Sequence, residues 1–200
     1  ITFYKKFTNK VEYILKKKIC VFGGSKSGLN PENEKNAQMI GQMIAESNFD
    51  IIYGGGEKGI MGAVASSGIR FGAKTTGIIP KFLVSKDIVN SSLPNHFNSE
   101  LILTESMHER KKLMYENSDG FVILPGGIGT LDECFEVLTW CQLDQIKNKN
   151  VGILNFEGYW NPLIFLIKHL IDEEFMTSDN LNYFEEIKNN NEFKKYLKNI

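Results

Sequence analysis

The stretch GFVILPGGIGTLDE, residues 120–133, joins an apolar run to a glycine-rich turn and then to two acids. The run before Pro125 is rich in β-branched and aromatic side chains, which is typical of a buried strand. From Thr130 to Gln142, apolar residues return at helical spacing. The stretch therefore predicts a strand, a tight turn and a helix in succession.

The same order of strand, glycine turn and helix recurs through the chain. KICVFGG (18–24) and DIIYGGG (50–56) are apolar runs that stop at glycine, and a helical pattern follows each. The first of these helices is predicted to open with Asn30 as its cap and Pro31 as its first residue. Further strands are predicted in TTGIIP, ELILTES and VGILN, and further helices in residues 59–68, MHERKKLMYENS, NPLIFLIKHLIDEEF and a polar segment near the C-terminus. Apolar strands that alternate with helices predict an α/β fold, with a doubly wound parallel sheet covered on both faces.

The composition is typical of one soluble globular domain, with 200 residues, 42% of them hydrophobic and 24% charged. We place this domain at residues 18–200. Residues 1–17 are interpreted as a basic N-terminal extension that lacks the apolar core of a secretory signal. The net charge of −1 gives no reason to expect nucleic acid as a partner. No apolar run approaches 18 residues, so no membrane partner is expected either.

The three cysteines, Cys20, Cys134 and Cys141, form no CxxC pair and lie in apolar or helical patterns. We interpret them as buried thiols, which fits a reducing compartment and a cytoplasmic location. The sequence contains no cluster of His, Cys and acids with ligand spacing, so no metal is expected.

The glycine turns at residues 23, 54 and 126 each follow a predicted strand. In a parallel sheet the carboxyl ends of the strands lie at one edge, where ligands bind. We therefore expect the three turns to converge on one site.

The first turn, GGSKSGLN, has Gly23 and Gly28 at P-loop spacing. Leu29-Asn30 stands where a P-loop has the lysine and hydroxyl that hold a terminal phosphate and Mg²⁺, so hydrolysis of a nucleoside triphosphate is disfavoured. Ser25 is interpreted either as a hydroxyl that binds a ligand or as a plain turn residue.

The second turn, GGGEKGIMG, matches GxGxxG. A dinucleotide site also needs an acid at the end of the next strand, and that strand ends in Ile79-Pro80-Lys81. NAD is therefore disfavoured. A close approach of the backbone at Gly54, Gly55 and Gly56 to a smaller nucleotide is better supported.

The third turn has Gly126, Gly127 and Gly129, with Ile128 between them, and exposes backbone N–H groups at a helix start. Such donors and the helix dipole favour an anion such as a phosphomonoester, and Thr130 adds a hydroxyl.

Two interpretations remain open for the acids that follow. Thr130-x-x-Glu133 has the spacing of a capping box, and Asp132 would complement the dipole of the first helical turn. Alternatively, these acids take part in binding and chemistry.

LPGGIGTLDECFEVLTW, together with MHERK and YGGGEKGIMG, resembles the Lonely Guy phosphoribohydrolases, a family often mislabelled as lysine decarboxylases. The resemblance runs from about Lys18 to Phe175. It implies a Rossmann-like fold, commonly in a homodimer. It also implies hydrolysis of the N-glycosidic bond of an N6-modified adenosine 5′-monophosphate to the free base, a cytokinin, and ribose 5-phosphate. No cofactor is expected.

The resemblance implies that Arg110 and Glu133 are the essential catalytic pair. It further implies substrate contacts at Lys111, Thr139 and Asp87, although relatives usually carry Glu at the position of Asp87. The full predicted substrate-binding set is Ser25, Gly54, Gly55, Gly56, Asp87, Met107, Lys111, Gly126, Gly127, Ile128, Gly129, Thr130, Asp132 and Thr139.

In this reaction the glycines and the acids would have separate roles. The glycines would hold the phosphate while Glu133, one helical turn deeper, faces the ribose. Departure of the base develops positive charge at the anomeric carbon, which an ionised Glu133 would stabilise while it orients the attacking water. Arg110 would offset the negative charges; without the resemblance it is interpreted as a solvated arginine. His108 is interpreted as structural, or as assisting departure of the base.

A non-catalytic nucleotide-binding or molybdenum-cofactor-binding protein of similar fold is the alternative, and a hydrolase of unmodified AMP is another. A decarboxylase is disfavoured because no lysine has a recognisable context for an imine with pyridoxal phosphate. Met61, Met107 and Met114 fit either a pocket for the base or plain core.

The helix 130–142 has apolar residues on more than one face, among them Phe135, Leu138 and Trp140. Such a helix is expected to be buried all round. Packing against a second copy would achieve this, so we expect a homodimer.

Overall fold

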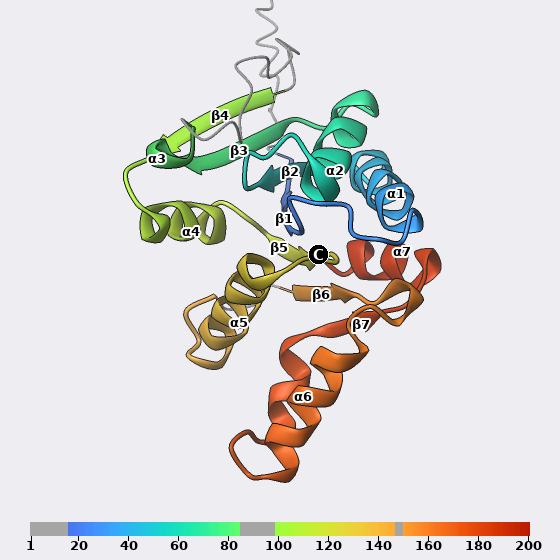
Figure 1. The fold of residues 1–200 in the computed structure, drawn as a ribbon, viewed down its shortest axis with the longest axis vertical. Helices are drawn as coiled ribbons and strands as arrows, with labels where there is room; N and C mark the ends of the chain where they lie inside the picture. The colour runs from blue at the N-terminus through green and yellow to red at the C-terminus, as the bar shows by residue number, and fades with distance from the viewer. Residues whose placement is uncertain (1–15, 85–98, 147–149) are drawn as a thin grey trace, which may run out of the picture.

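A computed structural model describes residues 16–84, 99–146 and 150–200. Within them lies a seven-stranded sheet, in which every neighbouring pair of strands is parallel (Figure 1). The strand order is β4-β3-β2-β1-β5-β6-β7. The strands are β1 (Lys18–Phe22), β2 (Asp50–Tyr53), β3 (Thr75–Pro80), β4 (Ser99–Thr104), β5 (Gly120–Ile123), β6 (Asn150–Leu154) and β7 (Glu185–Ile187).

The helices cover both faces of the sheet. Successive strand residues point to opposite sides, so each strand contributes apolar side chains to both faces. In β1, Ile19 and Val21 pack in the core under α1, α2 and α7, whereas Cys20 and Phe22 pack in the core under α4, α5 and α6 (Figure 1). The helices are α1 (Glu32–Glu46), α2 (Gly59–Arg70), α3 (Lys81–Leu83), α4 (Met107–Glu116), α5 (Ile128–Gln142), α6 (Asn161–Asp172) and α7 (Asn190–Lys198), with 3₁₀ turns η2 (Phe156–Gly158) and η3 (Ser178–Tyr183). The predicted doubly wound parallel sheet is confirmed.

The direction of strand addition reverses at β1. Strands β2 to β4 extend the sheet on one side of β1, and β5 to β7 extend it on the other. The connections after β1 and β5 therefore diverge, and a crevice opens at the carboxyl ends of these two strands. This is where the glycine turns of β1 and β5 lie.

The structure confirms the predicted strands and corrects some boundaries. Helix α1 begins at Glu32, so Pro31 precedes the helix instead of opening it. Helix α5 begins at Ile128 instead of Thr130, because the glycine turn itself enters the helix. Strand β7 was not predicted, since a three-residue edge strand that contains two glutamates has no apolar run. All of the predicted extension except residues 16 and 17 lies outside the described residues.

The expectation that α5 is buried all round is wrong for the single chain. Its buried residues are Thr130, Glu133, Cys134 and Val137. Phe135, Leu138 and Trp140 are only partly buried. One face of α5 packs on the sheet, and the other apolar side chains lie near the surface of the chain.

Candidate active site

The loops after β1, β2 and β5 interlock at the carboxyl edge of the sheet. The Gly24 N–H donates to the Pro125 carbonyl at 2.9 Å, which ties the β1 loop to the β5 loop. Gly59 adopts φ +65°, and a Cβ there would lie 2.4 Å from the Ser25 carbonyl carbon, so only glycine lets the β2 loop pass the β1 loop. The predicted convergence of the three turns is confirmed.

These loops enclose a cavity of about 350 Å³. Its walls come from the three glycine turns, from β3 and α3, and from the helices α2, α4 and α5. The lining residues are Gly23, Gly24, Ser25, Gly54, Gly56, Met61, Ile79, Leu83, Met107, Arg110, Gly127, Ile128, Gly129, Thr130, Asp132 and Glu133.

The N-terminus of α5 is open toward this cavity. Gly127 is the N-cap residue, no side chain caps the helix, and its first turn contains no acid. A Cβ built on Gly127 or Gly129 would meet no atom within 4 Å. Backbone donors at such a helix start suit a phosphate. The capping-box interpretation is wrong, because Thr130 lies three residues after the N-cap.

Arg110 and Glu133 form a buried ion pair at the base of the cavity. Nη2 of Arg110 lies 3.1 Å from Oε1 of Glu133, and the two side chains are only 10% and 7% exposed. Nε of Arg110 also donates to the Ile78 carbonyl of β3 at 3.1 Å, which fixes the plane of the guanidinium. A Cβ on Gly54 would lie 2.3 Å from Nη2, so Gly54 leaves room for this arginine.

The environment of Glu133 makes its carboxyl a weaker acid than that of an exposed glutamate. Burial raises the pKa of its carboxyl to about 7, although Arg110 and Lys111 lower that pKa, and Asp132 and Glu136 add to the rise. A group that titrates near neutral pH can exchange a proton with water or with a substrate under physiological conditions. Such perturbed groups cluster at functional sites.

Not every predicted residue contributes to this cavity. Gly55 is buried, with φ +78°, and is not one of the lining residues. Thr139 lies on an exposed part of α5, where its hydroxyl donates to the Phe135 carbonyl at 2.7 Å. Lys111 is paired with Asp132 and Glu136 and is not among the lining residues. Asp87 lies outside the described residues.

Two other side chains considered for the site, Met114 and His108, do not line the cavity. Met61 and Met107 line the cavity, but Met114 is fully buried in the core. His108, on the exposed side of α4, is not one of the lining residues either.

A smaller cavity of about 280 Å³ adjoins the first and shares Gly24, Ser25 and Gly127 with it. Tyr159, which precedes α6, lines this second cavity and donates its hydroxyl to the Gly126 carbonyl at 2.7 Å. Tyr159 therefore holds the third glycine turn from a segment far along the chain. Sequence reasoning missed it, because a lone tyrosine outside a motif carries no signal.

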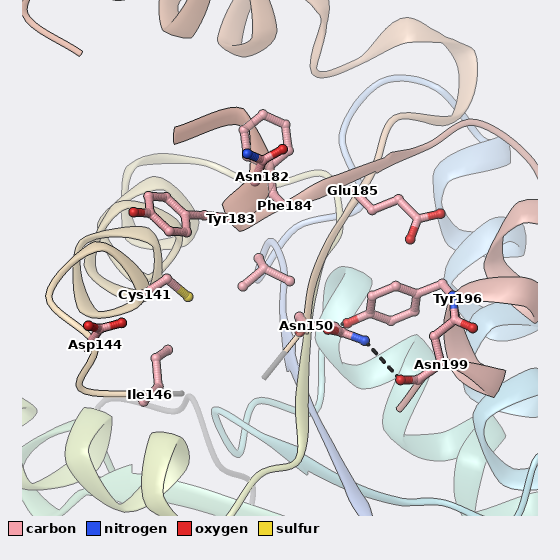
Figure 2. A pocket seen from close by; sticks show the side chains of 11 residues that line it. Cys141, Asp144, Ile146, Asn150, Asn182, Tyr183, Phe184, Glu185, Tyr196 and Asn199 are labelled. Carbon is pink, nitrogen blue, oxygen red and sulfur yellow. Dashed lines mark hydrogen bonds between the residues drawn. The ribbon is translucent and has the colours of Figure 1, made fainter. Parts of the chain in front are cut away.

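A larger cavity, of about 650 Å³, lies elsewhere among the described residues. Figure 2 shows polar side chains around it, with Asn150 donating to the Asn199 carbonyl at 3.2 Å. Asn150 and Glu185 open β6 and β7, so this cavity lies at the amino ends of those strands, opposite the glycine turns. Size alone does not mark the site. The open helix start and the buried ion pair lie at the carboxyl edge.

Within the described part of the chain, no group of three or more His, Cys, Asp or Glu side chains is arranged to hold a metal ion. The described groups at the carboxyl edge include a buried carboxylate, a guanidinium and backbone donors.

The fold and the site define a Rossmann-like α/β protein with a ligand cavity at the switch point of its sheet. The chain belongs to the family described as "Possible lysine decarboxylase", whose model matches residues 61–197. It is 40% identical to the cytokinin riboside 5′-monophosphate phosphoribohydrolase LOG7 of Arabidopsis thaliana, over 80% of this chain and 71% of that protein. It is 39% identical to LOG2 of the same plant, a protein of the same name, over 81% and 73% of the two chains.

Two solved structures show the same fold. The molybdenum cofactor carrier protein of Chlamydomonas reinhardtii matches with a TM-score of 0.65 and 20% identity, over 92% of this chain and 96% of that chain. The molybdenum cofactor binding protein of Rippkaea orientalis matches with a TM-score of 0.64 and 20% identity, over 92% and 97%. At this identity the likeness extends to the fold alone.

Proposed function

We propose that the protein hydrolyses the N-glycosidic bond of an N6-modified adenosine 5′-monophosphate, releasing the free base and ribose 5-phosphate. The observation that carries this proposal is the buried Arg110–Glu133 pair in the same cavity as the open start of α5. The names of the relatives, which are about 40% identical over most of their length, support the same reaction.

The substrate phosphate binds the backbone N–H groups at the start of α5, near Gly127 and Gly129. Glu133 lies on the same helix, about one turn further on, and therefore faces the ribose of the bound nucleotide. The C1′–N bond breaks with its electron pair leaving on the base, and positive charge develops at C1′. The ionised Glu133 stabilises this charge and takes a proton from the water whose oxygen bonds to C1′. That proton passes, directly or through water, to the departing base, so neutral base and ribose 5-phosphate are released and Glu133 is ionised again.

Arg110 keeps Glu133 in place and favours its ionised form. Its guanidinium is fixed by Glu133 and by the Ile78 carbonyl, so it cannot swing into solvent at low cost. It also contributes positive charge to a cavity that must hold a phosphate dianion and a carboxylate. Met61 and Met107 provide apolar surface for the base.

Neither rival activity gains support from a specific feature of the site. A decarboxylase that uses pyridoxal phosphate needs a lysine in the cavity, and the cavity around Arg110 and Glu133 has none among its described lining residues. A pure carrier has no need of a buried acid with a pKa near 7.

The protein is proposed to act as a homodimer through the face formed by α5 and α6. Both helices cover the same face of the sheet. On α6, Phe165 is 73% exposed and Leu166 is also exposed; Phe175, just beyond the helix, is 83% exposed. These exposed side chains of α6 and the segment after it are apolar surface that a second copy would cover.

A cytoplasmic location is also proposed. Cys134 and Cys141 are free thiols, which fits a reducing compartment. In the described ranges, no helix reaches the length and apolarity of a bilayer span.

The test is to incubate the protein separately with AMP and with isopentenyl-AMP, without added metal or cofactor. Chromatography should show free base and ribose 5-phosphate in equal amounts. Their release should be faster from isopentenyl-AMP, the N6-modified nucleotide, than from AMP. Binding of both nucleotides without release of base would contradict the proposed hydrolysis and favour a carrier.

A further inference from the structure

A second ionic cluster joins α4 to α5 directly beside the Arg110–Glu133 pair. Nζ of Lys111 lies 3.0 Å from Oδ2 of Asp132 and also pairs with Oε2 of Glu136. The hydroxyl of Tyr115 donates to the same Glu136 oxygen at 3.1 Å. One ammonium group, supplied by α4, thus holds two carboxylates of α5.

These two carboxylates flank Glu133 along its helix. Asp132 precedes Glu133 and Glu136 follows one turn later, so both bring negative charge toward it. Among the described residues, the charged or titratable side chains that act on Glu133 are Arg110, Lys111 and Tyr115 from α4, and Asp132 and Glu136 from α5. Only Arg110 and Lys111 among them favour its ionised form.

The Lys111 ammonium is protected from solvent screening, because its side chain is only 11% exposed. Burial lowers its pKa, but hydrogen bonds to Glu136 and Asp132 raise that pKa above its ordinary value overall. Lys111 therefore stays charged across the working pH range of an enzyme, and its donors are directed to the two acids.

We propose that Lys111 is a positioning residue, which keeps Glu133 ionisable by neutralising Asp132 and Glu136 instead of contacting the substrate. Lys111 is not among the side chains that line the cavity. The effect of Lys111 on the rate rests on the proposed hydrolysis, in which Glu133 acts as a carboxylate. The effect of Lys111 on the titration of Glu133 does not depend on the proposed hydrolysis.

The test compares wild type with Lys111→Met. Carbon-13 NMR of the glutamate carboxyls follows the titration of Glu133, whose resonance is assigned by its absence in Glu133→Gln. Loss of the ammonium should move the titration of Glu133, and the rising limb of kcat/KM, to higher pH by about one pH unit. Hydrolysis would then fall about five-fold at pH 7 and stay within about two-fold of wild type above pH 9.

Two further variants separate charge from structure. Lys111→Met/Glu136→Gln restores the net charge of the wild-type cluster and should return the titration close to its wild-type position. Glu136→Gln alone, which keeps Lys111 and an acceptor for Tyr115, should move it to lower pH. If Lys111→Met does not fold, the test rests on Glu136→Gln alone. An unchanged titration of Glu133 in Glu136→Gln would then overturn the proposal.

The substrate-contact interpretation makes a different prediction. A KM for AMP raised about ten-fold or more in Lys111→Met, with the titration of Glu133 unmoved, would overturn our proposal. If wild type releases no base while the NMR titration shifts as expected, the proposed hydrolysis fails and the role of Lys111 stands.

Discussion

At the scale of single residues, the site depends on a carboxyl whose pKa is close to neutral. Burial is the main cause that raises the pKa of Glu133 to about 7, and the proposed reaction uses the ionised form. We therefore expect kcat/KM to rise with pH, with an inflection near pH 7, because kcat/KM reports groups of the free enzyme. A profile from pH 5 to pH 9 with isopentenyl-AMP measures this inflection.

Glu133→Gln is the matched variant. Its amide keeps the shape of the carboxyl and still accepts a hydrogen bond from Arg110. Turnover should fall roughly 10²–10³-fold, by analogy with the loss of one preorganised electrostatic group, and the inflection should disappear. Unchanged base release in this variant would remove Glu133 from the chemistry.

Gly54 is the residue whose missing side chain admits Arg110. In Gly54→Ala, the new methyl group would lie 2.3 Å from Nη2 of Arg110 and 3.2 Å from Sδ of Met61. The guanidinium is held by Glu133 and by the Ile78 carbonyl, so displacing it breaks a buried ion pair and should also lower the thermal midpoint. Hydrolysis should fall about 10²-fold at a temperature where the variant is still folded. Wild-type hydrolysis by the folded variant would contradict the role of Gly54 in admitting Arg110.

The residues of the site differ in how far the sequence predicts them. Arg110, Glu133 and the third glycine turn belong to contiguous motifs, and those motifs place them at strand ends and on helices. The orientation of Lys111 and the contact of Tyr159 depend on how distant elements pack, and no local pattern encodes this. Thr139 lies within a motif, yet in the single chain its side chain is directed to the backbone of its own helix.

At the scale of elements, α5 is proposed to combine anion binding with chemistry. The sequence suggested a capping box at Thr130, because its spacing to Glu133 fits one. In the structure the helix begins two residues earlier, at Ile128. Glycine tolerates both turn and helix conformations, so spacing alone could not fix the first residue. The earlier start leaves the backbone donors free and Glu133 directed at Arg110.

The open start of α5 predicts a strong preference for a phosphorylated substrate. Two charge-assisted hydrogen bonds to phosphate contribute about 1.5–3 kcal/mol each. Adenosine, which lacks the phosphate, should therefore react about 10²–10⁴-fold more slowly than AMP in kcat/KM. Inorganic phosphate should inhibit hydrolysis of AMP competitively. Adenosine turnover within ten-fold of that of AMP would place the phosphate elsewhere.

At the scale of the whole molecule, the alternation of strands and helices predicts a parallel sheet, but not the order of its strands. Strand order depends on pairings between residues far apart in sequence, such as Ile19 with Gly120. The reversal at β1 is nonetheless what opens the crevice where three separate glycine turns meet. The local pattern thus predicts the edge of the sheet that carries the site, and the pairings determine which loops share it.

The apolar surface over α5 and α6 predicts the state of the protein in solution. Sedimentation at micromolar concentration should give about twice the chain mass of 22.7 kDa. Phe165→Glu places a charge in the centre of the proposed interface and should shift the protein toward the monomer, because a buried unpaired charge is costly. Phe71→Glu is the matched control: Phe71 is also exposed, but it follows α2, which packs on the opposite face of the sheet. If both variants sediment as wild type, the subunits meet through a different surface. A monomeric wild type would contradict the proposed homodimer.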